Sequence, residues 1–529
     1  MNKTSENQTY KSPLRKLVKF FEQSRDNWKN KCLEAKALLK KLKNKIDYLE
    51  KSRAQWKKKT TEFKEKITEL EGELTEMKLK EERLKTELNE LKKKVENNSE
   101  VAACESFQVV PARHHYSLLS IRLFLELVLK ASISLRGAAN SIEIINSVLQ
   151  TKIPCPSWFS GRLWLLRLGY YKLMRPKKPG NDWVWIIDHT IQIGEPKCLV
   201  ILGVRLRDLP KPGHCLKHEN VEPITLLPVV KSNGQVVYEQ LEEATKKTGV
   251  PKEIIGDYAS DLKLGIEKFC QAHPETYHIY DIKHKTAAIL KRELKNDEIF
   301  QAFTKLASQT KNQIQQTPLA FLAPRKQKTK ARYMNVDTLI KWGKNILVFL
   351  DKQENKPDSK LSLEQIQEKL GWVKLFRQPL FEWEELFQVI RTTEHFVRNQ
   401  GIYYNCSVEL SFLLPFESQI ERTNRVIFEI LFFVNQESLK ANSKRFLGSS
   451  EVLESILGKQ KQLEKEQSKS GFTGLILGIA ALVSTTTTEV VKKALESIST
   501  RDVLTWSQKT FGKSVQAKRI EVFASDKAE

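Results

Sequence analysis

The sequence lacks the paired cysteines and long apolar runs that mark several protein classes. Its 7 cysteines are scattered with no Cys-x-x-Cys pair, which argues against a disulfide framework or a zinc ribbon and favours a reducing compartment. The longest apolar run, residues 474–483, is shorter than the roughly 20 residues of a membrane span. The N-terminal residues are polar and show no secretory signal. We therefore expect a cytoplasmic protein with no membrane partner, in which residues 474–483 form a buried helix.

Signatures of other enzyme and metal-binding classes are also missing. No Gly-x-Ser-x-Gly nucleophile elbow occurs. Residues 512–514 resemble only the end of a phosphate-binding loop, because Ser507 stands where its first glycine belongs. His214, Cys215 and His218 lie close in sequence, but no fourth zinc ligand lies nearby, so a surface loop is expected there.

The composition indicates a folded, strongly basic chain. With 40% hydrophobic and 9% aromatic residues, it is not a wholly disordered protein. At about 150 residues per domain, 529 residues suggest three or four domains. The 88 Lys and Arg residues exceed the 64 Asp and Glu residues, giving a formal charge of +24. Such an excess favours a polyanionic partner, with nucleic acid first and an anionic membrane surface second.

A heptad repeat runs through the first hundred residues, which are rich in Lys, Glu and Leu. With Leu42 at position d, every later d position as far as Leu91 is apolar, although several a positions are polar. This spacing predicts a coiled coil over residues 1–98, through which the protein would form a homodimer or a higher oligomer. The alternative is one long amphipathic helix packed on its own protein.

Residues 105–175 show dense apolar patterning with the spacing of short helices. We expect three of them, at 117–131, 134–151 and 157–168, with Ser157 as the N-cap of the third. That helix carries Arg162 and Arg167 beside aromatic residues, as candidate DNA contacts. A sharp turn before a basic last helix favours a helix-turn-helix-like DNA-binding domain. A plain helical subdomain explains the pattern equally well.

The periodicity changes to that of strands after a basic linker at 175–180. Five short apolar runs read as strands, at 183–193, 198–206, 223–230, 253–257 and 277–281. Helices are expected between the third and fifth of these, at 236–248 and 260–272. This order predicts an α/β domain with a mixed sheet.

Residues 285–445 read as mostly helical, and the chain from 446 onward continues with a helix, the apolar helix and a basic tail at 511–529. The helical segment contains a strongly basic stretch. Four of its side chains are candidates for binding DNA phosphates without reading sequence: Lys326, Lys328, Lys330 and Arg332.

Two aspartates occupy positions where a carboxylate needs a partner. Asp188 lies inside the apolar first strand, where burial costs several kcal/mol unless the charge is paired or binds a cation. Asp257 follows the fourth strand, at the end where open α/β sheets place functional groups. If the two strands are neighbours, a hard divalent ion such as Mg²⁺ could hold both carboxylates. The alternative is an edge residue and an ordinary turn aspartate.

A third acid would complete a two-metal site. Glu454 is the candidate, and Lys461 lies two turns later on the same face of the expected helix. Glu451 is the rival on the adjacent turn, and a solvated helix face with ordinary charges is the alternative.

Four segments together resemble the bacterial insertion-sequence transposases of the DDE type. They are IIDHT, EIIGDYASDLKLGIEKF, YDIKHKTAAILKREL and SSEVLESILGKQK, in that order. The stretches SLRGAA and PSWFSGRLWLLRLGYY look like the DNA-binding region of the same family. The resemblance covers about residues 105–510. It implies an RNase H-like core in two parts, 181–284 and 446–510, separated by a helical insertion at 285–445.

The resemblance also implies roles for single residues. Asp188, Asp257 and Glu454 match the three catalytic acids, which would hold two Mg²⁺ or Mn²⁺ ions. Asp257 is preferred to Asp261 because it abuts the strand. Basic groups, Lys461 among them, would contact phosphates.

Three further positions bear on the match. Asp281 and His284 fit a recurrent strand-end D-x-x-H motif, without an assigned metal. Ser450 stands where the related YREK pattern has arginine, so of that pattern only the later lysine remains, and the handling of the substrate strand is in doubt.

The implied activity is cleavage of double-stranded DNA at transposon ends, followed by transfer of the freed 3′-hydroxyl into target DNA. A bacterial protein of the cytoplasm, associated with the nucleoid when active, is expected. Two alternatives stay open: a non-catalytic coiled-coil DNA-binding protein of domesticated or decayed origin, and an RNase H-like nuclease without strand transfer.

Overall fold

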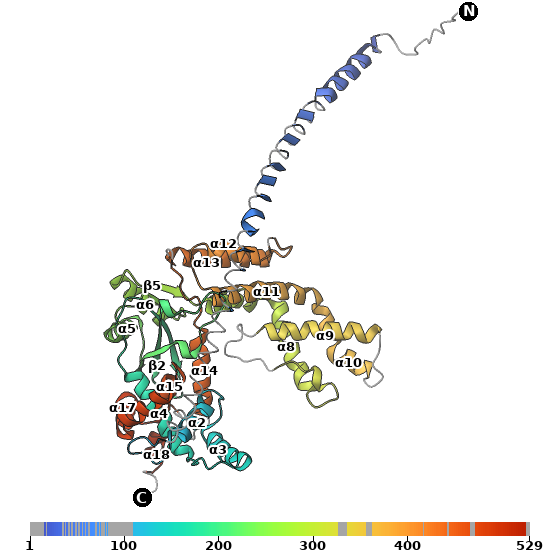
Figure 1. Ribbon diagram of the computed structural model, residues 1–529. Coiled ribbons are helices and arrows are strands. Elements are labelled where there is room, and N and C mark those ends of the chain that lie inside the picture. The colour runs from blue at the N-terminus through green and yellow to red at the C-terminus, as the bar shows by residue number, and fades with distance from the viewer. Residues whose placement is uncertain are drawn as a thin grey trace, which may run out of the picture. The chain divides into compact units, whose positions relative to one another are not determined.

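A computed structural model describes residues 109–325, 336–355, 362–415, 417–441, 444–465 and 471–524, together with scattered residues between 15 and 82. The chain divides into two compact units, Met1–Cys104 and Glu105–Glu529. Every described residue of the first unit is helical (Figure 1). Much of the heptad repeat lies outside the described residues, so self-association through it stays a prediction.

The second unit contains a mixed sheet of five strands, in the order β3-β2-β1-β4-β5 (Figure 1). β1 pairs antiparallel with β2, which pairs antiparallel with β3, whereas β1, β4 and β5 run parallel. The strands are β1 (Trp183–Ile191), β2 (Lys197–Arg205), β3 (Glu222–Val229), β4 (Glu253–Gly256) and β5 (Tyr277–Tyr280). The predicted mixed sheet is therefore confirmed, with each strand within two residues of its predicted ends.

Alternating side chains divide the sheet into two buried faces. Trp185 and Ile187 of β1 pack with α5 (Gly234–Thr248) and α6 (Ser260–Ala272). Their neighbours Val184 and Ile186 point the other way, into the larger core, and so does Ile255 of β4. Because successive residues of a strand alternate between faces, the residues that continue this second series after Ile186 and Ile255 belong to the same face.

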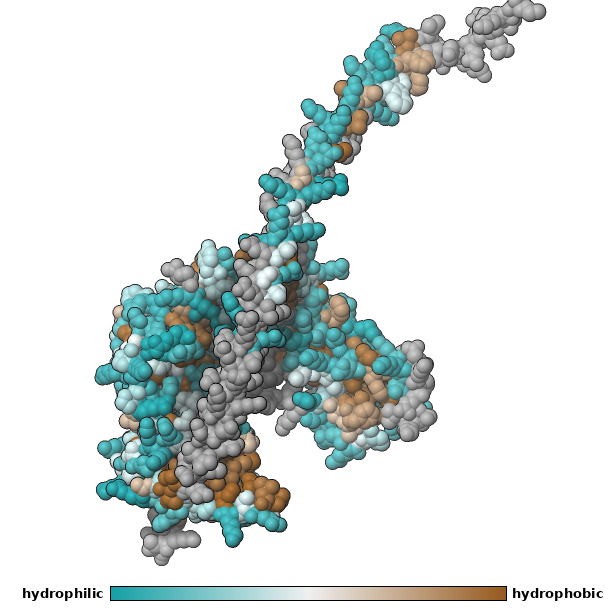
Figure 2. All heavy atoms as spheres, viewed as in Figure 1, coloured by the Kyte–Doolittle hydropathy of each residue, from teal (hydrophilic) through white to brown (hydrophobic). Residues whose placement is uncertain are grey.

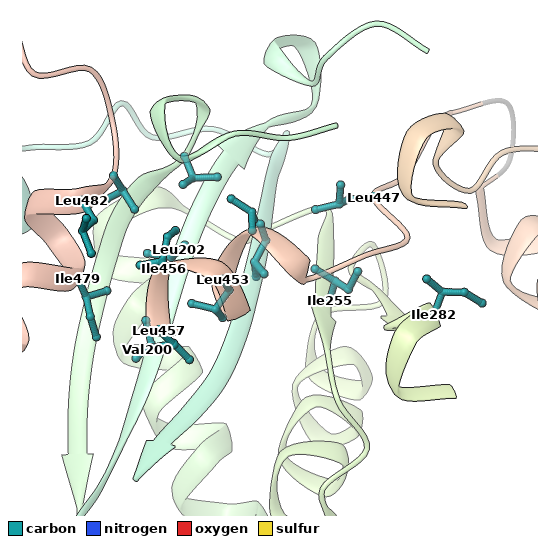
Figure 3. Close-up of a cluster of buried hydrophobic side chains, with 14 of the residues drawn as sticks. Val200, Leu202, Ile255, Ile282, Leu447, Leu453, Ile456, Leu457, Ile479 and Leu482 are labelled. Atoms are coloured by element: carbon teal, nitrogen blue, oxygen red, sulfur yellow. The ribbon is translucent and has the colours of Figure 1, made fainter. Parts of the chain in front are cut away.

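Two helices from the C-terminal part of the chain cover this second face. They are α14 (Glu451–Lys465) and α15 (Leu477–Leu482). Figure 3 shows Leu453, Ile456 and Leu457 of α14 beside Val200 and Leu202 of β2 and Ile255 of β4, with Ile479 and Leu482 of α15 close by. Residues 474–483 are buried, with a 3-10 turn, Gly474–Ile476, before α15, which confirms the buried helix expected there.

Three helices precede the sheet: α2 (Leu118–Leu129), α3 (Leu135–Leu149) and α4 (Trp158–Met174). Each begins after a serine whose side chain accepts a backbone N–H, and Ser157 is the N-cap of α4 as predicted. α4 ends later than expected because it is a core helix, packed on α15, α16 (Thr488–Ser497) and α17 (Thr500–Phe511). A Cβ atom on Gly169 would lie 2.1 Å from the Leu477 carbonyl oxygen, so α4 and α15 are nearly in backbone contact.

The described chain between β5 and α14 is mostly helical. Its longer helices are α7 (Ile282–Lys295), α8 (Glu298–Ile314), α9 (Asp337–Asn355), α10 (Leu363–Leu370), α11 (Arg377–Gln400), α12 (Cys406–Leu413) and α13 (Glu421–Ala441). Aromatic side chains, Phe303 and Trp383 among them, fill the core of α8 to α11. Beyond α17, α18 (Val515–Ala524) is the last described helix. Within the described ranges, no helix combines the length and apolarity needed to span a bilayer.

Candidate functional site

Asp188 and Asp257 lie side by side at one end of the sheet. In the parallel pairing of β1 with β4, Ile186 stands opposite Ile255. Extending this register by two residues places Asp188 opposite Asp257. Both residues continue the series that faces α14, so the two carboxylates share that face of the sheet.

The two carboxylates repel each other. Burial, followed by the charge of Asp257, raises the pKa of Asp188 to about 7. The backbone N–H of His189 donates to Asp188 Oδ1 at 2.7 Å, and the ammonium of Lys461, an exposed residue of α14, also opposes the rise. A divalent cation would relieve this repulsion, because it favours both ionised carboxylates.

Asp261, the alternative to Asp257, is an ionised carboxylate whose charge is balanced by Lys197. Its Oδ2 accepts hydrogen bonds from Lys197 and, at 2.6 Å, from Ser232 Oγ. Burial raises its pKa, but these two bonds outweigh that effect and bring the pKa of Asp261 to about 2. Its carboxylate therefore ties the start of α6 to β2, and Asp257 is the acid that acts on Asp188.

Glu454 of α14 is held by two cations from the first turn of α7. Lys283 Nζ donates to Glu454 Oε2 at 3.0 Å, and His284 Nε2 lies 3.4 Å from Glu454 Oε1. Burial raises the pKa of Glu454, but His284 and Lys283 outweigh it, so the pKa falls below its usual value. Glu454 is therefore ionised, and its charge is balanced by neighbouring residues.

His284 connects Glu454 with the two aspartates. Burial lowers the pKa of His284, but the bond to Glu454 and the charges of Asp281 and Asp257 raise it to about 9. The imidazolium in turn lowers the pKa of Asp188. His284 thus contacts Glu454 and interacts electrostatically with both Asp188 and Asp257.

A divalent metal fits this donor set only in part. Two facing carboxylates suit Mg²⁺, which proteins usually hold with one or two carboxylates plus substrate phosphates. Among the described residues, however, no three His, Cys, Asp or Glu side chains are grouped closely enough to hold a metal ion. Asp188 and Asp257 could therefore hold an ion, whereas Glu454 would first have to leave Lys283 and His284.

Glu451, the rival of Glu454, faces a different part of the structure. Its Oε2 lies 2.9 Å from Arg398 Nε, and both residues line a cavity of about 360 Å³. Cys215 and His218, considered above as zinc ligands, line the same cavity, and His218 Nε2 is bonded to Ser455 Oγ at 3.0 Å. Glu454 therefore contacts His284, whereas Glu451 contacts Arg398.

Asp281 and Lys283 have roles that the sequence did not reveal. Asp281 is fully buried, and its Oδ1 accepts the backbone N–H of His284 at 2.8 Å. Its Oδ2 accepts the N–H of Ser450 at 2.5 Å and the hydroxyl of Ser450 at 3.0 Å. Asp281 therefore joins the start of α7 to the start of α14 and positions the helix of Glu454. The sequence analysis named Asp281 only as part of the D-x-x-H motif, and its contact with Ser450 could not be predicted there.

The arginines proposed as DNA contacts in α4 differ in their surroundings. Arg167 donates to the carbonyl oxygens of Leu495 and Ile498, the latter at 2.5 Å, so its guanidinium fastens α4 to the end of α16. Arg162 is half-buried, and burial lowers its pKa. The prediction that the basic stretch contacts DNA through Lys326, Lys328, Lys330 and Arg332 concerns residues outside the described ranges.

The exposed surface of α3 mixes polar and apolar side chains. Ile144, Val148 and Leu149 are 62%, 72% and 66% exposed, and Figure 2 shows apolar side chains gathered in this part of the molecule. A recognition helix needs polar side chains that reach base edges in the groove. α3 does expose polar residues, Arg136 and Asn140 among them. The basic helix predicted to contact DNA is α4, however, so the surface of α3 does not test the prediction of a helix-turn-helix reader.

Comparison with solved structures found broad likenesses. The fold is similar to that of a Drosophila protein solved as the "P element transposase strand transfer complex", with a TM-score of 0.31 and 10% sequence identity. The alignment covers 74% of this chain and 94% of that chain. The TM-score is low, and we take no residue roles from it. No protein-family model matches the sequence, and no curated protein matches it either.

Proposed function

We propose that this chain is a metal-dependent DNA transposase of the DDE type with an RNase H-like core. The observation that carries the proposal is the pair of repelling carboxylates, Asp188 and Asp257, at the ends of adjacent parallel strands. The strand order β3-β2-β1-β4-β5, with β2 antiparallel to its neighbours, supports an RNase H-like core. α14, which carries the third acid, covers the same face.

Asp188 and Asp257 would hold Mg²⁺ or Mn²⁺ together with oxygens of the scissile phosphate. A bound ion supplies positive charge to the phosphate and lowers the pKa of a water molecule. Glu454 would join as the third ligand of a two-ion site after exchanging its contacts with Lys283 and His284. Released from Glu454, these two cations would face the phosphates of the DNA.

Basic side chains near the acids would hold the DNA backbone. Lys461 is exposed on α14 and close enough to influence Asp188. The net charge of +24 supports a polyanionic substrate. With the DNA held in place, the 3′-hydroxyl freed by hydrolysis would attack a phosphate of target DNA in the same site. The new phosphodiester bond would form as the bond to the 3′-oxygen of the target strand breaks and that oxygen leaves as a hydroxyl, without a covalent enzyme intermediate.

The test is cleavage and strand transfer with DNA carrying the ends of the element. We expect activity that requires Mg²⁺ or Mn²⁺ and that Asp188→Asn, Asp257→Asn and Glu454→Gln each reduce at least a thousandfold. Glu451→Gln is the matched control, because it removes a charge from the adjacent turn of the same helix, and it should retain activity. Equal losses in Glu451→Gln and Glu454→Gln would contradict the assignment.

A second function is favoured by one observation, the balanced charge of Glu454. Its contacts with Lys283 and His284 suit a protein that binds DNA without catalysis. Such a protein would bind DNA equally well with and without Mg²⁺ and would release no 3′-hydroxyl. An RNase H-like nuclease would cut the DNA but form no joined products, which a labelled target plasmid detects.

A further inference from the structure

α12 and α13 expose a continuous apolar face. Figure 1 shows the two helices side by side, and Ser407 Oγ donates to Asn435 Oδ1 at 3.2 Å between them. Phe412, on α12, is 82% exposed, and Phe428 and Phe432, on α13, are 72% and 57% exposed. Three aliphatic side chains of the same helices are more than half exposed: Val408, Leu413 and Leu439.

The apolar face has the pattern of a protein interface. Along α13 the exposed positions recur every three or four residues, which makes one stripe of the helix. Phe428 and Phe432 occupy its middle, and their rings stack with centroids 6.4 Å apart. Arg425 and Gln436 lie beyond them on either side. An aromatic centre with a polar rim is typical of surfaces that associate.

We propose that this face binds a second copy of the chain through two-fold packing of α13 against α13. Phe428 and Phe432 lie one turn apart on either side of the middle of α13. In an antiparallel pairing centred between them, each Phe428 meets Phe432 of the second copy. An isologous contact requires such self-complementary spacing.

The size of the face agrees with a homodimer. At about 200 Å² for a phenylalanine, the three aromatic residues expose on the order of 400 Å². The aliphatic residues bring the total to roughly 600 Å², near the ~800 Å² that each partner contributes to a stable interface. A dimer formed here would carry two Asp188–Asp257 pairs, but the proposal does not depend on their activity.

The test compares full-length proteins by sedimentation equilibrium. All proteins carry Leu70→Pro and Leu84→Pro, which disrupt the helix of the heptad repeat, so that the predicted coiled coil cannot hold the dimer. With an otherwise wild-type sequence the chain should dimerise reversibly, and Phe428→Ser/Phe432→Ser should weaken the dimer at least thirtyfold. The matched control is Phe321→Ser, since Phe321 is 68% exposed outside this face. Unchanged dimerisation of the double variant, or a wild-type chain that stays monomeric, would overturn the proposal.

Hydroxyl-radical footprinting locates the contact independently. Peptides from α12 and α13 of the wild-type chain should be modified less in the dimer than in the monomer. Equal protection at all concentrations would mean that the chain's own residues cover this face, and the proposal would fail. If the double variant does not fold, Phe412→Ser replaces it, because that side chain is the most exposed of the three aromatic residues. We expect the Asp188→Asn variant to lose catalysis and still dimerise. This result would show that the dimer contact does not depend on the proposed function.

Discussion

Asp281 and Ser450 stand 169 residues apart in the chain, yet they share two hydrogen bonds. Both donors of Ser450 reach the same carboxylate oxygen, and the other oxygen caps α7 through the N–H of His284. The buried side chain of Asp281 thus joins the connection between β5 and α7 to the start of α14, the helix that carries Glu454.

Removing this carboxylate should destabilise the protein strongly. Asp281→Ala would leave the buried N–H and hydroxyl of Ser450 and the partly buried N–H of His284 without their acceptor, at a cost of about 3 kcal/mol in the free energy of unfolding. Ser450→Ala loses only the hydroxyl bond and should cost about 1 kcal/mol. Urea denaturation measures both. A smaller loss for Asp281→Ala than for Ser450→Ala would contradict the role assigned to Asp281.

Asp188→Asn should stabilise the metal-free protein at neutral and alkaline pH. The pKa of Asp188 is raised to about 7, so the folded state binds a proton that the unfolded state releases near pH 4. Stability therefore falls as pH rises from about 4 to 7. We expect the variant to be about 1–2 kcal/mol more stable at pH 8 and equal to the wild type near pH 4. Urea denaturation of both proteins at the two pH values measures this difference. If Asp188→Asn were less stable than the wild type at pH 8, the repulsion between Asp188 and Asp257 would be refuted.

His284→Gln should bind Mn²⁺ more tightly in the absence of DNA. The imidazolium is charged at pH 7.5, pairs with Glu454 and lies near Asp257. Its removal takes a positive charge from the site and frees Glu454, so we expect about a tenfold gain in affinity. Electron paramagnetic resonance of free Mn²⁺ measures the change. In the His284→Gln/Glu454→Gln variant the gain should largely disappear; a gain that persists would exclude Glu454 as its cause.

Two glycines in helix interiors should respond in opposite ways to alanine. Gly169→Ala forces α4 away from the Leu477 carbonyl and should cost about 2–3 kcal/mol. A Cβ atom on Gly458, in α14, would meet open space, so Gly458→Ala should gain about 0.5–1 kcal/mol from helix propensity. Thermal unfolding of the two variants tests the close packing of α4 on α15, and similar melting temperatures would argue against it.

Much of the fold was predictable because local patterns carried it. The five strands are short apolar runs between turn residues, and Ser157 marked the start of α4 by its capping side chain. The position where α4 ends was not predictable from the periodicity of its apolar residues alone. Its later residues Lys172 and Leu173 are buried against elements more than 300 positions away, and the helix is buried on most sides.

The site was predictable only where it follows from the sheet. Asp188 and Asp257 are neighbours because β1 and β4 are paired, and this pairing entered the sequence analysis only as a condition. The partners of Glu454 depend on how α7 approaches α14, which no local pattern specifies. The same holds for Arg167, which the sequence presents as a basic surface residue and the fold uses as an internal anchor.

The late arrival of α14 has a consequence for synthesis on the ribosome. Ile255 leaves the exit tunnel about 200 residues before α14, the helix that covers it, and Val184 and Ile186 leave earlier still. Translation adds about 5–20 residues per second, so this hydrophobic face of the nascent sheet would stay exposed for roughly 10–40 s. A chaperone that shields this surface during translation should raise the yield of native protein, whereas slowing translation without one should favour aggregation.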